Sequence, residues 1–228
     1  MPNIPLAERL RPKTIDEYIG QEHLVGRNGV FRKFFETGNV PSFILWGPPG
    51  VGKTTLAKIV ATQLDRPFFT LSAVTSGVKE VREVIESARK QRFFDQRPPF
   101  LFIDEIHRFN KSQQDSLLGA VEQGIVTLIG ATTENPSFEV ISPLLSRCQV
   151  YILRPMEDKD LQTLLDRALT ADIELREREI EVQQTGALFR FAGGDARKLL
   201  NILDIIVGAT DGKVTITDQY VTDCLQQN

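Results

Sequence analysis

A glycine-rich segment ending in a lysine and a threonine is the part of this sequence best suited to chemistry. It reads Gly47-Pro-Pro-Gly-Val-Gly-Lys53-Thr54, a complete G-x-x-x-x-G-K-T motif. Glycines let the backbone curl so that successive N–H groups converge on phosphate oxygens, and the lysine neutralises the β- and γ-phosphates. Thr54 is expected to place its hydroxyl on Mg²⁺. The motif therefore predicts a site for ATP and Mg²⁺.

The residues expected to contact this nucleotide are Pro49, Gly50, Val51, Gly52, Lys53, Thr54 and Thr55. The alternative is a glycine-rich turn that binds nothing. Four fixed positions recur by chance in roughly one sequence of this length in a hundred. The motif also lies between an expected strand and an expected helix, which is the context that phosphate binding requires. Phosphate binding is therefore the favoured interpretation.

A second chemical element follows the glycine-rich segment at an apolar strand. The stretch Phe100-Leu-Phe-Ile-Asp104-Glu105 is a hydrophobic run that ends in two acids. We expect Asp104 to hold Mg²⁺ and Glu105 to orient and deprotonate the attacking water. An acidic pair that only caps an exposed loop is the alternative, and the preceding motif makes it the weaker one.

The elements around these motifs predict an α/β fold. Short apolar runs alternate with helical patterns, as a parallel sheet with crossover helices requires. We expect five parallel strands at residues 42–46, 67–72, 100–104, 126–131 and 149–153, with helices at residues 54–64 and 78–91. Each strand is almost wholly apolar, which is typical of strands covered on both faces.

The strand signals stop after Pro155, and helical patterns follow. We expect a small all-helical lid domain at residues 156–228, with helices at 158–170, 179–191, 196–207 and 217–225. The predicted α/β domain then spans residues 1–155. Cys148 and Cys224 lack metal-ligand spacing, and no apolar run is long enough to cross a bilayer. A cytoplasmic protein without membrane contact is expected.

Several motifs together resemble the AAA+ superfamily. They are the two elements above, the stretch Gly-Ala-Thr-Thr133-Glu-Asn, the stretch Leu-Ser-Arg147-Cys, and Gly-Gly-Asp-Ala-Arg197 in the helical region. More closely, residues 6–26 and the stretches FIDEIHRFNKSQQD and IGATTENPSFEVISPLLSRC resemble the replication-associated recombination protein A family. The resemblance covers essentially the whole chain.

The resemblance implies roles that spacing alone does not show. Thr133 would be sensor 1, which positions the water. Arg147 would be an arginine finger that reaches the nucleotide of a neighbouring subunit, and Arg197 would be sensor 2. Residues 1–26 would supply an adenine pocket, lined by Arg11, Pro12 and Ile19. For Arg147 and Arg197 the alternative is a surface salt bridge, worth under about 1 kcal/mol.

The resemblance also implies partners. It predicts DNA with forks, gaps or single-strand ends, together with replication proteins such as a single-strand-binding protein, and a nucleoid-associated location. Family members usually continue into a C-terminal tetramerisation region, whereas this sequence stops at Asn228. We expect a fragment of a homo-oligomeric protein, itself monomeric, in which Arg147 has no partner site.

Basic residues provide candidate DNA contacts. They are Lys79, Arg82, Arg89, Lys90, Arg92, Arg108 and Lys111, with Phe93, Phe94 and Phe109 as candidate stacking residues. Glu80, Glu83 and Glu86 are interleaved with the first group, so a solvated helix face explains it equally well. For the phenylalanines, core packing is the better interpretation. His23 and His107 have no evident catalytic partner.

The leading hypothesis is a DNA-dependent ATPase that remodels DNA or protein–DNA complexes at stalled or gapped replication forks. A clamp-loader-like subunit and a Holliday-junction branch-migration motor remain open alternatives. A nucleotide-dependent scaffold without enzymatic activity is a third, and it requires an idle Glu105 or Arg147.

Overall fold

The computed structural model describes residues 4–74, 76–92 and 97–226. Its chain forms two compact units. The sheet unit comprises Lys13–Pro48 and Lys53–Arg154, and the lid unit comprises the chain up to Pro12, the loop Pro49–Gly52 and the chain from Pro155 onward. The division into domains at residues 1–155 and 156–228 stays a prediction.

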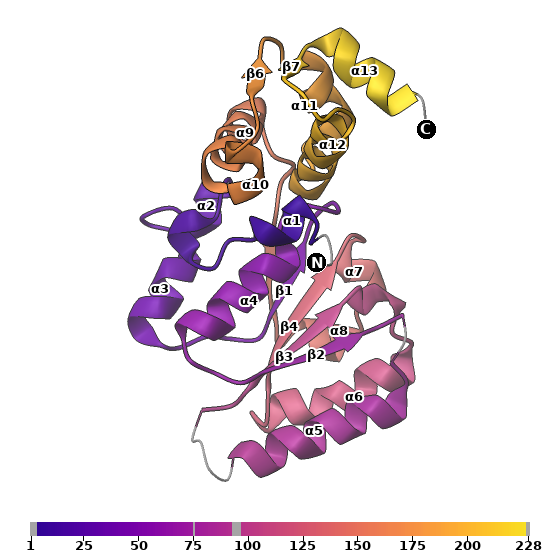
Figure 1. Cartoon of the computed structure of the whole chain (residues 1–228). Coiled ribbons are helices and arrows are strands. Elements are labelled where there is room, and N and C mark those ends of the chain that lie inside the picture. Colours follow the sequence, from indigo (N-terminus) through magenta and orange to yellow (C-terminus); the bar gives the residue numbers. More distant parts are fainter. Residues whose placement is uncertain (1–3, 75, 93–96, 227–228) are drawn as a thin grey trace. The chain divides into compact units, whose positions relative to one another are not determined.

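The sheet unit is built on five parallel strands in the order β2-β3-β4-β1-β5 (Figure 1). The strands are β1 (Phe43–Trp46), β2 (Phe68–Ser72), β3 (Phe100–Asp104), β4 (Thr127–Thr132) and β5 (Gln149–Ile152). The helices are η1 (Ile15–Glu17), α2 (Glu22–Val25), α3 (Val30–Thr37), α4 (Lys53–Gln63), α5 (Val78–Arg92), η2 (Ile106–Arg108), α6 (Lys111–Glu122), α7 (Pro136–Glu139) and α8 (Ser142–Leu145). The predicted α/β class and its five strands are confirmed.

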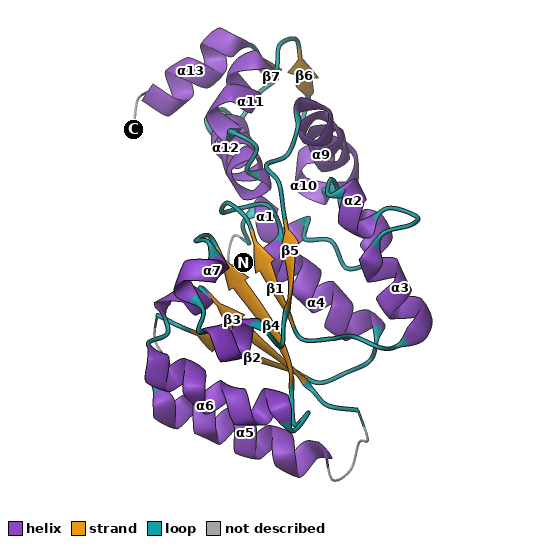
Figure 2. Ribbon diagram, turned by 180° about the vertical axis from the view of Figure 1, so that it is seen from behind, coloured by secondary structure: helices purple, strands orange, loops and turns teal. Residues whose placement is uncertain are grey.

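Helices cover both faces of this sheet, as Figure 2 shows from behind. On one face, Ile44, Leu101 and Ile103 pack with residues of α5 and α6 such as Val81 and Leu117. Alternate residues of the same strands point to the other face, towards α3 and α4. There Phe43 packs edge-to-face against Phe31, with ring centroids 5.5 Å apart. Burial on both faces explains why the strands read as unbroken apolar runs.

The lid unit contains mainly helices. They are α1 (Leu6–Arg9), α9 (Asp158–Ala171), α10 (Ile173–Arg176), α11 (Gly186–Ala192), α12 (Ala196–Gly208) and α13 (Asp218–Gln226). Helix α12 is amphipathic and presents a buried row that includes Leu199, Leu203 and Ile206. Helices α1, α9, α11 and α13 contact it. Helix α12 is therefore the core element of this unit.

The prediction of an all-helical lid is wrong in one respect. Strands β6 (Ile180–Val182) and β7 (Val214–Ile216) pair in parallel as a two-stranded sheet. The helix expected at residues 179–191 begins only at Gly186. Apolar residues at two-residue spacing, Val214 and Ile216, are buried, as is typical of strands. Each strand has only three residues, so the two-residue repeat of a strand is hard to distinguish from the 3.6-residue repeat of a helix.

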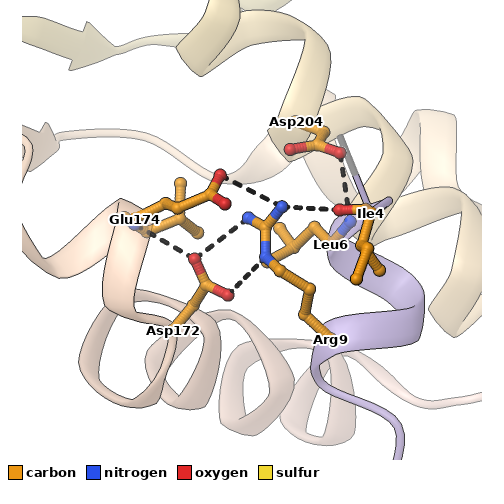
Figure 3. A network of polar contacts seen from close by, with 7 residues as sticks. Ile4, Leu6, Arg9, Asp172, Glu174 and Asp204 are labelled. Carbon is orange, nitrogen blue, oxygen red and sulfur yellow. Dashed lines mark hydrogen bonds and ion pairs between the residues drawn. The ribbon is translucent and has the colours of Figure 1, made fainter. Parts of the chain in front are cut away.

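The N-terminal segment belongs to the lid unit through a polar network (Figure 3). The guanidinium of Arg9 donates to both carboxylate oxygens of Asp172, at 2.8 and 3.0 Å. It also lies 3.1 Å from Glu174 and donates to the carbonyl of Ile4. The N–H of Leu6 donates to Asp204 at 3.1 Å. Residues far apart in the sequence therefore fix α1 to α10 and α12.

Both cysteines are free thiols. Burial raises the pKa of Cys148 to about 12, so this thiol is inert at neutral pH. Within the described part of the chain, no helix is both long and apolar enough to cross a membrane.

Candidate nucleotide site

Three of the strands bring the predicted chemical residues to one edge of the sheet. Because β1, β3 and β4 run parallel and adjacent, their carboxyl ends meet at the same edge. Trp46, the last residue of β1, pairs with Thr132, the last residue of β4. Asp104 ends the neighbouring β3. Ligands of open α/β sheets bind at this edge, where the chain crosses to different sides of the sheet.

The glycine-rich loop begins directly at the end of β1. The N–H of Gly47 donates to the carbonyl of Thr132 at 3.1 Å. Lys53, the first residue of α4, is only 7% exposed. Its ammonium donates to the carbonyls of Gly47 and Pro48 at 2.7 and 2.8 Å. The loop therefore folds back so that the lysine lies against its beginning.

The middle of the loop needs glycine. Gly50 has φ +71° and Gly52 has φ +97°, a region of backbone conformation that favours glycine. This part of the chain clusters with the lid unit, where the N–H of Ala196 donates to the carbonyl of Gly50 at 3.2 Å. A Cβ at Gly50 would lie 1.8 Å from a carboxylate oxygen of Asp195. Both conformation and space therefore exclude a side chain there.

The two acids after β3 occupy different positions. Asp104 is the last residue of the strand and is half-buried. Glu105 follows with φ 55° and ψ 45°, the left-handed region that residues other than glycine rarely adopt. Such conformations concentrate at functional sites, where the surrounding structure holds them. Ile106, which is fully buried, anchors the backbone immediately after Glu105.

A histidine that the motifs leave without a role joins these elements. Nδ1 of His107 lies 3.0 Å from Oγ1 of Thr132. Its Nε2 lies 3.3 Å from Oε2 of Glu105. The sequence assigned His107 no partner, and this contact with Glu105 was missed. The signal was its position two residues after Glu105, because η2 turns the chain back over the end of β4.

The oxygen ligands expected for Mg²⁺ are of the kind that this hard cation prefers. Thr54 would offer a hydroxyl from the first turn of α4, and Asp104 a carboxylate from the end of β3. Among the described residues, no cluster of three or more His, Cys, Asp or Glu could hold a metal by itself. A hydroxyl and a carboxylate fit an ion that takes its remaining oxygens from phosphates and water.

The remaining predicted residues of the sheet unit lie at its surface or edge. Thr133 is half-buried and comes one residue after the end of β4. Arg147 follows α8 and is exposed, and its guanidinium forms an ion pair with Glu122 and donates to the carbonyl of Pro143 at 2.6 Å. Ile19 is half-buried, after η1. Their roles stay predictions.

Three predicted nucleotide contacts belong to the lid unit. Arg197 is exposed in the first turn of α12, next to the N-cap residue Asp195. Arg11 pairs with Glu8, and Pro12 follows it. The start of the loop, both acids and Thr133 therefore belong to the sheet unit. Arg197, Arg11 and Pro12 belong to the lid unit.

The candidate DNA-contact residues differ in their exposure and in whether they form ion pairs. Exposed ion pairs join Lys79 to Glu83 and Arg89 to Glu86, as a solvated helix face requires. Phe109 is 3% exposed and belongs to the core, so it is not a base-stacking residue. The side chain of Arg92, together with Phe93 and Phe94, lies outside the described residues. Arg82, Lys90, Arg108 and Lys111 are exposed.

Comparison with known families and proteins agrees with this geometry. The family model described as "ATPase family associated with various cellular activities (AAA)" matches residues 43–156. Replication-associated recombination protein A of Haemophilus influenzae is 44% identical over 210 residues, covering 91% of this chain and 47% of that protein. Its namesake in Escherichia coli K12 is 43% identical over 226 residues, covering 96% of this chain and 50% of that protein. The predicted family resemblance is confirmed.

Two further similarities extend this picture. The ATPase WRNIP1 of Dictyostelium discoideum is 46% identical over 217 residues, covering 94% of this chain and 25% of that protein. Among solved structures, the RuvB Holliday junction branch migration motor of Thermotoga maritima matches with a TM-score of 0.76 and 28% identity, covering 96% of this chain and 72% of that one. The chain spans about half the length, or less, of the curated relatives named here.

Proposed function

Because the chain belongs to the AAA family of ATPases, we propose that it binds ATP with Mg²⁺ at residues 47–55 and hydrolyses it to remodel DNA or protein–DNA complexes at stalled or gapped replication forks. The relatives named for replication-associated recombination support the cellular role. They are more similar in sequence than the branch-migration motor is, at 43–44% against 28% identity. The fork role is therefore favoured over branch migration.

One observation carries the enzymatic part of the proposal. The beginning of the phosphate loop contacts Thr132 at the end of β4 directly, and Glu105, which follows β3, is linked to Thr132 through His107. The carbonyl of Thr132 accepts from Gly47, and its hydroxyl contacts His107, which in turn contacts Glu105. The start of the phosphate loop and the proposed base, Glu105, therefore lie on one connected edge of the sheet.

Each residue has a separate task in the proposed reaction. Lys53 neutralises charge on the β- and γ-phosphates, and the loop amides bind their oxygens. Thr54 and Asp104 would hold Mg²⁺, which supplies further charge neutralisation when bound. Glu105 orients the water and takes its proton. Thr133 helps to position the water, and Arg197 and, from a neighbouring subunit, Arg147 complete the charge stabilisation around the γ-phosphate.

Adenine recognition and DNA contact are the parts of the proposal that rest on resemblance. Arg11, Pro12 and Ile19 would line the adenine pocket. The exposed cations Arg108 and Lys111, with the basic residues of α5, would contact DNA phosphates without reading sequence. Replication proteins such as a single-strand-binding protein would share the same nucleoid location.

Turnover of the wild-type chain and of Glu105→Gln tests this proposal. ATP hydrolysis is measured alone and with forked, gapped and duplex DNA at one fixed salt concentration, because phosphate contacts depend on salt. We expect stimulation by forked or gapped DNA, and in the variant nucleotide affinity without hydrolysis. The amide keeps the shape of the carboxylate but cannot take a proton. Near-normal hydrolysis by Glu105→Gln would contradict the assignment of the base, and equal rates with and without DNA would contradict the DNA-dependent role.

A further inference from the structure

An array of close polar contacts runs from the end of β4 to the carboxylate proposed as the base. It consists of Thr132, His107 and Glu105, with contacts of 3.0 and 3.3 Å. We propose that His107 is a positioning residue, which holds the carboxylate of Glu105 towards the attacking water and ties it to the end of β4. This inference rests on the proposed function, in which Glu105 takes the proton from water.

Burial makes this array well defined. The side chain of His107 is 13% exposed and that of Glu105 is 29% exposed. Thr132 is wholly buried and belongs to the central part of the sheet. The position of Thr132 is fixed, because it pairs with Trp46 of β1 and its carbonyl accepts from the N–H of Gly47. His107 therefore links the partly exposed carboxylate of Glu105 to a residue whose position is fixed.

The hydrogen bonds of the Thr132 hydroxyl limit the combinations of protons on the two ring nitrogens of His107. The Thr132 hydroxyl accepts from the N–H of Glu134 at 2.9 Å and lies 3.1 Å from the carbonyl of the same residue. If the hydroxyl donates to His107, the imidazole is neutral with its proton on Nε2. If it donates to the carbonyl, Nδ1 must donate to it, and only an imidazolium then also has a proton on Nε2. The positioning role requires the proton on Nε2, from which the ring can donate to Glu105.

The backbone of Glu105 explains why a positioning residue is needed. Its left-handed conformation, with φ 55°, directs the side chain differently from a residue that continues the strand. The carboxylate still has free side-chain torsions, and the fixed backbone does not remove them. A base displaced by about 1 Å can cost roughly a hundredfold in rate. The contact with His107 at 3.3 Å restricts those torsions.

Two isosteric replacements separate the two contacts of the imidazole. The amide nitrogen of Gln reaches the place of Nε2, whereas that of Asn reaches the place of Nδ1. We expect His107→Ala and His107→Asn to lower kcat of ATP hydrolysis by about 10- to 100-fold. KM and the equilibrium affinity for ATP should change little, and His107→Gln should recover most of the rate. Ser112→Ala, on the exposed face of α6, is the matched control and should retain the wild-type rate.

Coupling to the base gives a second criterion. In single-turnover measurements, His107→Ala should slow the wild-type chain but should leave the slow residual rate of Glu105→Gln unchanged, because the residue acts through the carboxylate. Equal rates for His107→Gln and His107→Asn would overturn the proposal. An additive effect in the double variant would overturn it as well.

A readout without ATP separates this proposal from the proposed function. The chain has two histidines, so ¹⁵N-labelled rings give two sets of signals, and His23→Gln assigns them. We expect the His107 Nε2 signal to be that of a protonated nitrogen and to move in both Glu105→Gln and Thr132→Val. Signals unmoved in both variants would overturn the positioning role, whatever the turnover. Moved signals in a chain without ATP turnover would support the array and contradict only the proposed function.

Discussion

The backbone N–H of Gly47 donates to the carbonyl of Thr132 over 3.1 Å, which joins the first residue of the phosphate loop to the last residue of β4. On its other side, Gly47 lies against the neighbouring β5 end. A Cβ added to it would lie 2.5 Å from the carbonyl oxygen of Leu153. Gly47 is therefore required by close packing of backbone, in addition to any role in phosphate binding.

Replacing Gly47 by alanine should destabilise the protein, because the obstacle is backbone that cannot rotate away. We expect Gly47→Ala to lower the free energy of unfolding by about 1–3 kcal/mol, as overpacking does. Gly119→Ala is the matched control, since an added Cβ there meets nothing within 4 Å in the middle of α6. It should stabilise the protein by about 0.5–1 kcal/mol. Urea denaturation of both variants measures this, and equal effects would contradict the steric account.

Removal of the loop lysine should abolish tight ATP binding. Lys53 is buried and lies within hydrogen-bonding distance of the carbonyls of Gly47 and Pro48. In Lys53→Ala the loop would oppose the charge of the phosphates with backbone dipoles alone, without the ammonium. Equilibrium titration with a fluorescent ATP analogue measures the affinity. Lys58→Ala, on the exposed side of the same helix, is the control and should bind normally. Unchanged affinity in Lys53→Ala would count against the phosphate site.

The pair formed by Arg9 and Asp172 should contribute to stability in a pH-dependent way. Burial of Asp172 opposes its ionisation, but hydrogen bonds from Arg9 and from backbone N–H groups of α10, with the charge of Arg9, outweigh this effect and lower the pKa of Asp172. A carboxyl with a lowered pKa stabilises the folded state above its unfolded pKa of about 3.9. This stabilisation is lost as the pH falls through the folded pKa.

Asp172→Asn isolates this contribution, because asparagine can still cap α10, as Asp172 does by accepting from Leu175. We expect the variant to lose about 1–3 kcal/mol of unfolding free energy at pH 7. The difference from the wild-type chain should shrink below about pH 4. Thermal unfolding followed by circular dichroism at several pH values measures it. A difference that stays constant down to pH 2.5 would show that the charge of Asp172 is not its source.

The sequence predicts the sheet well and its connections less well. Apolar strands such as Phe100–Asp104 are recognisable because both faces are buried, and a glycine-rich motif at their edge has few alternative meanings. The pairing of Ile180–Val182 with Val214–Ile216 was missed, since segments of three residues carry almost no periodicity. The array through His107 was missed as well. It depends on the left-handed backbone conformation of Glu105, which no local sequence pattern predicts.

Polar contacts between residues far apart in the chain are a second kind of feature that the sequence does not predict. Arg9 and Asp172 are separated by 163 positions, and nothing in either segment indicates the other. Arg147 shows the same limit, because its motif predicts a residue that acts on another subunit, whereas within one chain its guanidinium pairs with Glu122. The two interpretations make different predictions for the same variants.

Arg147 and Glu122 are both about 40% exposed, at 39% and 41%, so their ion pair should contribute little to stability. If Arg147 acts only through this pair, Arg147→Ala and Glu122→Gln should have the same small effects. If Arg147 reaches the γ-phosphate of a neighbouring subunit, Arg147→Ala in an assembled full-length protein should lower hydrolysis by about 10³ or more while ATP binding stays normal. Glu122→Gln should then keep the rate, because the guanidinium is still present.

Mixing experiments decide between these interpretations. Subunits with Arg147→Ala keep their phosphate loop, and subunits with Lys53→Ala keep their arginine. Where the two meet in a mixed assembly, an intact arginine faces an intact phosphate loop, so hydrolysis should exceed the sum of the two separate variants and depend on the mixing ratio. The 228-residue chain alone, without a neighbouring subunit, should already be slow and change little on Arg147→Ala. If mixed assemblies form, as measured by mass spectrometry of differently labelled subunits, and no ratio exceeds that sum, Arg147 does not act between subunits.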